Sequence, residues 1–370
     1  MQIQELSATL SILKAACDPK SLNAAYKQVY IRPTLLQFRA GWASLDIPLD
    51  LGIEGLPEEG IAVDCTMFAD SIASLPQNED VKLVFKNGAL AWSCNSTHGK
   101  LAVNKTEMPE SIHLKEEGDH DEQTASIYYF ETNKDVARGF ELGANSVGSS
   151  SMLNVGLGGI TLRWQSGEMW FLSSDNVSIS AYKATGLPET KSGPLEKTIS
   201  AKEANILKML ASRQGGTFYI RDTGILYLDN KMTAFFTWLS SMKNDIYSVV
   251  VNFLDGENIV ALPKARVTAF ISRAQALAQV RGRFFVSLKI ANAALSLEFA
   301  EATAQTTEYE LATLIEGTPD CHLFVDAVKM SAALGDCVEL VVDHIENNVL
   351  LFRAEDAKFF YMISAKASEE

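Results

Sequence analysis

Residues 81–92 read Val81-Lys82-Leu83-Val84-Phe85-Lys86-Asn87-Gly88-Ala89-Leu90-Ala91-Trp92, two apolar stretches on either side of an Asn-Gly pair. Short runs of apolar and β-branched residues are typical of strands, and Asn-Gly between two such runs indicates a two-residue hairpin turn. The arrangement recurs in residues 217–228 around Thr223-Gly224 and in residues 338–352 around Asn347-Asn348. These stretches predict three equivalent antiparallel hairpins.

Six stretches have apolar residues at spacings of three and four, which is the pattern of an amphipathic helix. The hairpins follow the second, fourth and sixth of them, and the first residues of successive stretches are 60 to 68 positions apart. A pitch this constant indicates internal repetition. The predicted helices span residues 4–17, 64–75, 131–146, 199–213, 262–279 and 324–335.

The first, third and fifth helices are followed by a different sequence that is also shared. Residues 36–42 parallel residues 160–167 and 285–292. The smallest repeat is then a helix with about four strands, and two repeats make a domain. We expect an α+β fold in which each domain has two helices packed on antiparallel sheets. The predicted domains are residues 1–122, 123–253 and 254–370.

Composition excludes several classes of protein. With 370 residues, 47% apolar and 21% charged, the chain is typical of a globular protein with two or three domains. Its apolar runs fall short of the roughly 18 residues that a membrane-spanning helix needs. No basic segment followed by an apolar stretch begins the chain, so we expect a soluble protein of the cytoplasm.

The cysteines and histidines form no ligand pattern. Five cysteines without a CxxC pair predict buried thiols rather than a zinc site or a disulfide framework. His113 and His120 lie in an acidic stretch that is better explained as a solvated linker than as a metal site. We expect neither a metal ion nor a cofactor.

Catalytic motifs are absent from the sequence as well. The cluster Gly156-Leu157-Gly158-Gly159 has no Lys-Ser or Lys-Thr after it and precedes a predicted strand, so a hairpin explains it better than a phosphate-binding loop. No GxSxG, HExxH or catalytic Cys-His spacing occurs. The sequence predicts a protein that is not an enzyme.

Charge is distributed unevenly along the chain. The net charge of −14 divides into −8, +1 and −7 over the three predicted domains, and the helices are less acidic than the strands and loops. Arg266 and Arg273 are seven residues apart and share one face of the fifth helix. Such residues commonly do no more than solvate an outer face, and the second helix, with Asp64 and Asp70, has no basic residue. Recurrence of basic residues on the other helices nevertheless favours a binding face.

Three segments are similar, in order and spacing, to segments of one known family. They are residues 63–76, 172–176 and 359–364. Together with the six-fold repeat, they resemble the bacterial-type DNA polymerase sliding clamp, the β subunit of DNA polymerase III. The segments match the family in order and spacing more than in residue identity, which is consistent with a bacteriophage-encoded clamp or with a distant bacterial one.

The resemblance implies a processivity factor for DNA replication. Two subunits of such a clamp close head to tail into a ring, with helices around the hole and sheets on the outside. Because duplex DNA is held topologically, weak phosphate contacts suffice, and an acidic exterior with a mildly basic bore suits this function. The residues expected to contact DNA are Lys14, Lys20, Lys134, Arg138, Lys202, Lys208, Arg266 and Arg273.

The resemblance also implies an apolar groove between the second and third domains, into which polymerases and the clamp loader insert a short peptide. Ile179 and Val249 keep the apolar character that a leucine or phenylalanine anchor needs. Alternatively, groove residues could belong to the core or cap a turn. By position the groove comprises Leu157, Ser174, Asn176, Val177, Ser178, Ile179, Asn244, Ser248, Val249, Tyr361, Met362, Ile363, Ser364, Ala365 and Lys366.

Several groove positions depart from the family. Asn176-Val177-Ser178 stands where the family has Gly-His-Arg. Asn244 replaces a proline, and residues 363–366 replace Met-Pro-Met-Arg. We therefore expect the groove to accept a different peptide.

A structural assembly protein is the main alternative to a clamp. A virion component built from repeated β-rich units would assemble without DNA, and a hydrolase with an unrecognised site is a more remote possibility. A clamp on circular DNA should resist salt that abolishes ordinary phosphate binding and should leave once the circle is cut. Neither alternative predicts that dependence on DNA topology.

Overall fold

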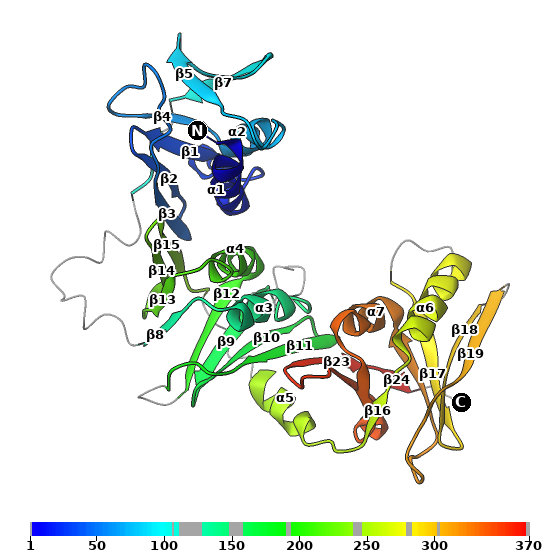
Figure 1. The fold of residues 1–370 in the computed structure, drawn as a ribbon. Coiled ribbons are helices and arrows are strands. Elements are labelled where there is room, and N and C mark those ends of the chain that lie inside the picture. The colour runs from blue at the N-terminus through cyan, green and yellow to red at the C-terminus, as the bar shows by residue number, and fades with distance from the viewer. Residues whose placement is uncertain are drawn as a thin grey trace. The chain divides into compact units, whose positions relative to one another are not determined.

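One order of elements occurs three times in the chain (Figure 1). The computed structural model describes residues 2–105, 107–110, 128–147, 158–189, 194–239, 246–278, 283–301 and 304–367. Within these ranges a helix and four strands are followed by a second helix and three strands, and this order then repeats. The predicted repeat of one helix with about four strands is therefore confirmed.

The bounds of the elements are as follows. The first copy comprises α1 (Ile3–Ala16), β1 (Gln28–Arg32), β2 (Leu35–Arg39), β3 (Ala43–Pro48), β4 (Ile61–Asp64), α2 (Cys65–Ala73), β5 (Lys82–Lys86), β6 (Ala89–Cys94) and β7 (Thr97–Asn104). The second comprises β8 (Tyr128–Glu131), α3 (Lys134–Leu142), β9 (Gly159–Gln165), β10 (Glu168–Ser174), β11 (Ser178–Ala184), β12 (Leu195–Ser200), α4 (Ala201–Ala211), β13 (Thr217–Ile220), β14 (Gly224–Asp229) and β15 (Met232–Thr237). After α5 (Ile246–Leu254), the third comprises β16 (Ile259–Ala261), α6 (Lys264–Ala278), β17 (Phe285–Ala291), β18 (Ala294–Glu301), β19 (Ala304–Thr313), β20 (Cys321–Asp326), α7 (Ala327–Asp336), β21 (Glu339–Val341), β22 (Val349–Arg353), β23 (Phe359–Ser364) and β24 (Lys366–Ala367).

The repeat extends to the residues that precede the first helix of each copy. Strand β8 pairs with β13, and β16 pairs with β21. In the first copy Gln2 forms the corresponding antiparallel bridge to Asp80, just before β5. The three copies therefore share their pairing as well as their order of elements.

All six predicted helices are present, and side-chain caps explain where several of them begin. The carboxylate of Asp64 accepts a hydrogen bond from the Met67 N–H at 2.8 Å. Asp64 therefore caps α2, which begins at Cys65. Asp326 caps α7 in the same way, accepting from the Val328 N–H at 2.9 Å. None of the helices in the described ranges has the length and apolarity that crossing a membrane requires.

Helix α5 is not among the predicted helices. Its sequence contains three consecutive valines, residues 249–251, and β-branched residues favour strands over helices. Ile246 and Val250 are buried against a sheet, so packing rather than local preference maintains this helix.

The predicted strand equivalence in the first copy is wrong by one strand. Residues 36–42 correspond to β2, whereas residues 160–167 and 285–292 correspond to β9 and β17. Strand β1 pairs with β2 and β4, just as β9 pairs with β10 and β12. The equivalent of β9 is therefore β1, which is separated from α1 by a long connection that contains a short 3₁₀ helix.

The three predicted hairpins are confirmed. Strand β5 pairs with β6, β13 with β14 and β21 with β22, all antiparallel. In the first hairpin Asn87 and Gly88 have φ of 54° and 73°, the left-handed conformation that a two-residue turn of this kind requires.

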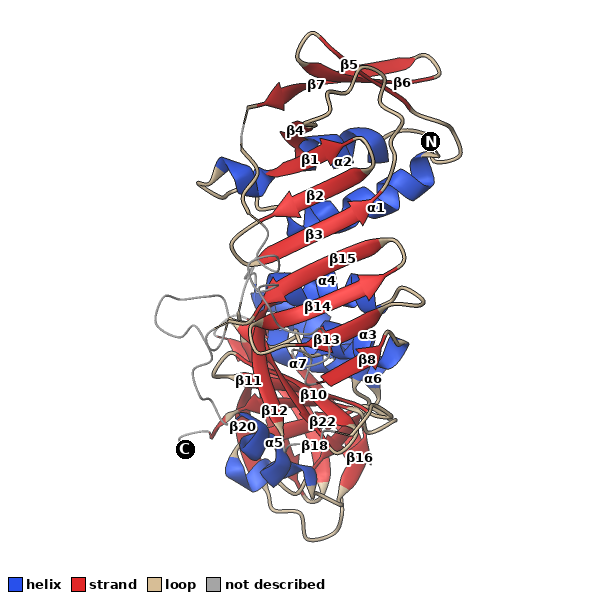
Figure 2. Cartoon of the chain, turned by 90° about the vertical axis from the view of Figure 1, so that its left-hand side faces the viewer, coloured by secondary structure: helices blue, strands red, loops and turns tan. Residues whose placement is uncertain are grey.

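One compact unit comprises residues 1–137 and 202–239. Its strands form an 11-stranded sheet of order β5-β6-β7-β4-β1-β2-β3-β15-β14-β13-β8. Helices α1, α2 and α4 lie on one face of this sheet (Figure 2). Their apolar residues, among them Leu6, Phe68 and Leu207, are fully buried there.

The other compact unit comprises residues 138–201 and 240–370. It contains an 8-stranded sheet, β12-β9-β10-β11-β23-β22-β21-β16, and a 5-stranded sheet, β19-β18-β17-β20-β24. Alternate side chains of β10 lie on opposite faces of the larger sheet. Phe171 packs edge-on against Phe140 of α3 on one face, and Trp170 packs edge-on against Tyr247 of α5 on the other.

The predicted division into three domains stays a prediction. The boundary at 122/123 lies outside the described residues, and the boundary at 253/254 falls within α5. Each of the two larger sheets also combines strands from two predicted domains.

Two helical glycines provide a matched test of the packing. A Cβ atom on Gly139 of α3 would overlap the Phe171 ring, whereas one on Gly335 of α7 would have no atom of the described residues within 4 Å. Gly139→Ala should lower the free energy of unfolding by about 1–3 kcal/mol, as overpacking does. Gly335→Ala should raise it by about 0.5–1 kcal/mol because alanine favours the helix. Urea denaturation of both variants measures this, and equal effects would contradict the packing of α3.

Candidate functional site

Helix α5 lies across one face of the 8-stranded sheet, on an apolar cluster. Ile246 and Val250 of the helix pack there with Trp170, Phe360 and Met362 of the sheet. The stacked rings of Trp170 and Phe360 have centroids 6.2 Å apart. Because the cluster fixes the helix on the sheet, it also fixes the space beside the helix.

A cavity of about 180 Å³ opens between α5 and the ends of the neighbouring strands. Most of the predicted groove residues line it: Ser174, Asn176, Val177, Ser178, Ile179, Val249, Met362, Ile363 and Ser364. Its lining also includes Phe253 and Val349, which were not predicted. Segments that are far apart in the sequence therefore meet at this cavity.

The remaining predicted groove residues are outside the described residues or outside the described lining of this cavity. Leu157 and Asn244 lie outside the described residues. Tyr361 is fully buried, and its hydroxyl donates a hydrogen bond to the Ser178 Oγ at 3.2 Å. Described but away from the lining are also Ser248, Ala365 and Lys366.

The two lining residues that were not predicted follow from secondary structure. Phe253 is four residues after Val249, so both lie on one face of α5. Val349 begins β22 and pairs directly with Ser364 of β23. A helical assignment of residues 246–254 would have identified Phe253 from the sequence.

The cavity suits an apolar side chain. Ile179 is half-buried, and Val249 remains 43% exposed although it is a large apolar residue. Burying such surface against a ligand is favourable by roughly 25 cal/mol per Å². The space is smaller than a typical drug-sized site of about 300 Å³ or more, so it suits one or two anchoring side chains.

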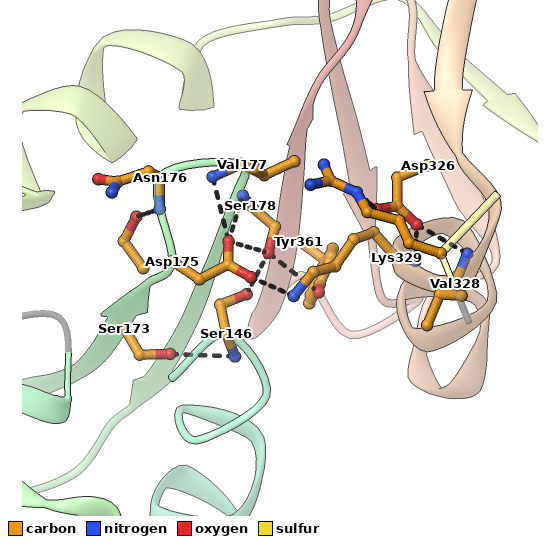
Figure 3. Close-up of polar contacts among 12 residues, drawn as sticks. Ser146, Ser173, Asp175, Asn176, Val177, Ser178, Asp326, Val328, Lys329 and Tyr361 are labelled. Carbon is orange, nitrogen blue, oxygen red and sulfur yellow. Dashed lines mark hydrogen bonds and ion pairs between the residues drawn. The ribbon is translucent and has the colours of Figure 1, made fainter. Parts of the chain in front are cut away.

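A tight turn at residues 174–178 forms the polar wall of the cavity (Figure 3). The Asp175 Oδ1 accepts hydrogen bonds from the N–H of Val177 at 3.1 Å, from the N–H of Ser178 at 2.7 Å and from the Ser178 Oγ at 3.0 Å. Its Oδ2 forms an ion pair with the Lys329 Nζ of α7. Burial of the Asp175 carboxyl opposes its ionisation, but Lys329 and the two N–H groups outweigh that effect and hold its pKa below the ordinary value.

Most of the residues predicted to contact DNA have partners within the chain. Lys14 of α1 forms an ion pair with Asp70 of α2, and Arg138 of α3 forms one with Asp336 of α7 at 2.9 Å. The Lys202 ammonium lies over the Trp42 ring, 4.6 Å from its centroid, and burial lowers its pKa. Lys208 is half-buried, whereas Lys20 and Lys134 are exposed.

Arg266 and Arg273 share one carboxylate. Both guanidinium groups bind Glu308 of β19, at 2.9 Å and 2.6 Å. Arg266 also donates to the backbone carbonyls of Tyr309 and Glu310. These arginines do lie on one exposed face of α6, as expected, but the single carboxylate of Glu308 offsets one of their two positive charges.

A second cavity, of about 620 Å³, lies beside β17 and β20. His322 lines it and is hydrogen-bonded through Nε2 to the Ser287 hydroxyl, a pair of the kind that nucleophilic enzymes use. Strand β17, which carries Ser287, pairs with β18 on one side and β20 on the other. The backbone N–H groups near Ser287 therefore form the hydrogen bonds of strand pairing, whereas an oxyanion hole would need such groups free to bind a substrate oxygen.

The comparisons with known proteins identify the fold. No family model matches the chain, and no curated protein matches it. DNA polymerase III subunit beta from Pseudomonas aeruginosa has a TM-score of 0.75 at 13% identity, covering 100% of this chain and 99% of that one. The Helicobacter pylori beta clamp in complex with 5-chloroisatin has a TM-score of 0.73 at 14% identity, covering 100% and 99%. This chain has the β-clamp fold.

The β-clamp fold accounts for the whole chain. The DNA polymerase sliding clamp from Bacillus subtilis also aligns with 100% of this chain and 98% of its own, at a TM-score of 0.73 and 15% identity. Identities this low establish the clamp fold alone. These proteins are bacterial, and nothing in them supports a bacteriophage origin.

The depressed pKa of Asp175 predicts a pH-dependent contribution to stability. Because this folded-state pKa lies below the unfolded value of about 3.9, the contribution is complete above that pH and is lost as the pH falls through the folded-state pKa. Asp175→Asn should therefore be less stable than wild type at neutral pH, by a gap that narrows below about pH 4. Urea denaturation across this pH range measures the gap.

Asp50→Asn is the matched control, since the exposed Asp50 accepts a hydrogen bond from the Gly52 N–H at 2.8 Å in a turn of its own. The difference in stability between Asp50→Asn and wild type should be smaller than that for Asp175→Asn. If the difference for Asp175→Asn stays constant as the pH is lowered, an ionised Asp175 carboxylate does not stabilise the turn.

Proposed function

We propose that the protein is a DNA sliding clamp, a non-enzymatic processivity factor that encircles duplex DNA and tethers a polymerase and a clamp loader through the groove beside α5. The observation that carries this proposal is the clamp fold over the full length of the chain. The cavity adds support, because it gathers residues that the family resemblance expects to bind a partner peptide.

The strand pairing supports a head-to-tail homodimer. Strand β3, the third strand of the group of four in the first copy, pairs with β15, the third strand of the group of three in the second copy. Strands β11 and β23 repeat this junction. The third strands left over are β19 and β7, so the same junction between two copies would join β19 of one to β7 of the other. Repeated at both ends, this heterologous contact closes a ring of two subunits.

One side of β19 has no paired strand among the described residues, and most of one side of β7 is likewise open to such pairing. In the described chain β19 pairs only with β18, and β7 pairs with β6 along its length and with β4 over two residues. An open edge presents unpaired N–H and C=O groups, and a second copy would satisfy them.

The charge distribution suits a clamp that slides. Four helix cations pair with the three carboxylates of Asp70, Asp336 and Glu308, so the net positive charge of these groups is small. Strong phosphate contacts would slow movement along DNA, whereas a closed ring retains the duplex without them. The net charge of −14 further disfavours binding of DNA to other surfaces.

An apolar peptide side chain is the ligand that the cavity suits best. A clamp from Pseudomonas aeruginosa has been solved bound to griselimycin. In this chain the turn that carries Asn176, Val177 and Ser178 offers small polar groups next to the apolar lining. A peptide with a leucine or phenylalanine anchor and few charges therefore fits this groove.

The topology of DNA tests the clamp function. Protein assembled on nicked circular DNA should survive a wash at salt that removes ordinary phosphate-bound proteins, and should dissociate when the circle is cut. Gel filtration of labelled protein with the DNA, before and after cutting, measures retention. Retention that is lost in salt, or that is the same on linear and circular DNA, would contradict encirclement and would favour an assembly protein.

Substitution of the apolar lining tests the groove. Val249→Asp and Ile179→Asp each place a charge where the peptide anchor would be buried, so binding of a short fluorescein-labelled peptide ending in Leu-Phe should fall by at least about tenfold. Fluorescence anisotropy measures the affinity, and circular dichroism checks the fold. Met67→Asp, at an exposed apolar residue of α2 far from this cavity in the sequence, is the control and should bind as wild type. Wild-type affinity in both groove variants would refute the assignment.

A further inference from the structure

The turn at residues 174–178 supplies much of the cavity lining. Ser174, Asn176, Val177 and Ser178 all contribute to it. The turn is held in an uncommon conformation, because Asn176 has a φ of 70°. A small change in the turn would therefore move several groove residues together.

Asp175 lies behind this wall and does not line the cavity. Its Oδ1 holds the turn closed through Val177 and Ser178, while its Oδ2 points away toward α7 and meets Lys329 (Figure 3). The two oxygens thus connect the groove wall to a helix that contributes no lining residue.

Lys329 is itself held in place by the start of α7. The Asp326 carboxylate caps the helix, accepting from the N–H of Val328 at 2.9 Å and of Lys329 at 3.2 Å, and it also binds Arg283. The Lys329 side chain is 23% exposed and that of Asp175 is 16% exposed. An ion pair with so little access to water is screened less than a surface pair.

A second set of hydrogen bonds joins the turn to β23, the strand that pairs with β11. The Ser178 Oγ accepts from the Tyr361 hydroxyl at 3.2 Å and lies 3.0 Å from the Ser146 Oγ. Tyr361 is buried and precedes Met362, which lines the cavity from β23. The anchored turn therefore keeps its position relative to β23, the neighbouring strand that also lines the cavity.

We propose that Lys329 is a positioning residue of the peptide groove: through Asp175 it holds the turn at residues 174–178 in the form that accepts the peptide. This inference rests on the proposed peptide-binding function. Without Lys329 the Asp175 carboxylate is left partly buried and uncompensated, and the turn relaxes to bring it water. The groove wall moves with it, although Lys329 never touches the ligand.

Lys329→Met tests the proposal, because it keeps the length of the side chain and removes its charge. The affinity for a short fluorescein-labelled peptide ending in Leu-Phe, measured by anisotropy, should fall about tenfold. Lys329→Arg should restore it to within about threefold of wild type, because the charge that Asp175 needs is present again. A role in stability alone would not produce this rescue.

Arg353→Met is the matched control. Arg353 pairs with Glu339 at 2.8 Å between β21 and β22, with side-chain exposures of 25% and 23%, and neither residue lines the cavity. This variant loses an ion pair of similar exposure and should bind the peptide as wild type. Equal losses in Arg353→Met and Lys329→Met would overturn the specific role of Lys329.

A double variant keeps the test decisive if Lys329→Met folds poorly. Asp175→Asn with Lys329→Met removes both charges and keeps an acceptor for the turn. Its affinity for the peptide should equal that of the single variant that binds less tightly. Additive losses, or wild-type affinity in folded Lys329→Met, would overturn the inference and leave the groove standing. Absence of binding by the wild-type protein would instead refute the proposed function.

Discussion

Antiparallel pairing between third strands is the interaction on which the rest of the structure depends. At β3–β15 and again at β11–β23 it joins the sheet of one repeat to that of the next. Each junction removes two open edges that would otherwise invite misassembly. The β11–β23 junction also creates the groove, because it brings Ile179 beside Met362. The fold, the candidate site and the proposed ring closure are thus consequences of one repeated contact.

Features that are encoded locally could be predicted from the sequence. Asn87-Gly88 defines its hairpin because both residues readily adopt positive φ, and Asp64 and Asp326 begin their helices as side-chain caps. Helix α5 could not be predicted in this way, because its valines favour strands and only packing on Trp170 and Phe360 makes it helical. Its absence from the predicted elements also explains why Phe253 was not assigned to the groove.

The candidate site could be predicted in part, and only through the resemblance to a known family. Alignment identified residues 176–179 and 362–364, but their meeting depends on strand pairing and on the docking of α5. The ion pairs were not accessible at all from the sequence. Arg266 and Arg273 form a basic face by helical periodicity, yet both bind Glu308 of β19, which offsets one of their two positive charges. Charge on a helix therefore predicts a binding surface poorly until the tertiary partners are known.

Ring closure can be measured by solution mass combined with hydrogen exchange. We expect a mass of twice 40.5 kDa. We also expect the amides of β7 and β19 that are not bonded to β6 or β18 to be protected in the assembled protein, and to lose protection together when dilution lowers the mass. A mass of 40.5 kDa at every concentration, or a dimer in which these amides exchange freely, would contradict the shared junction.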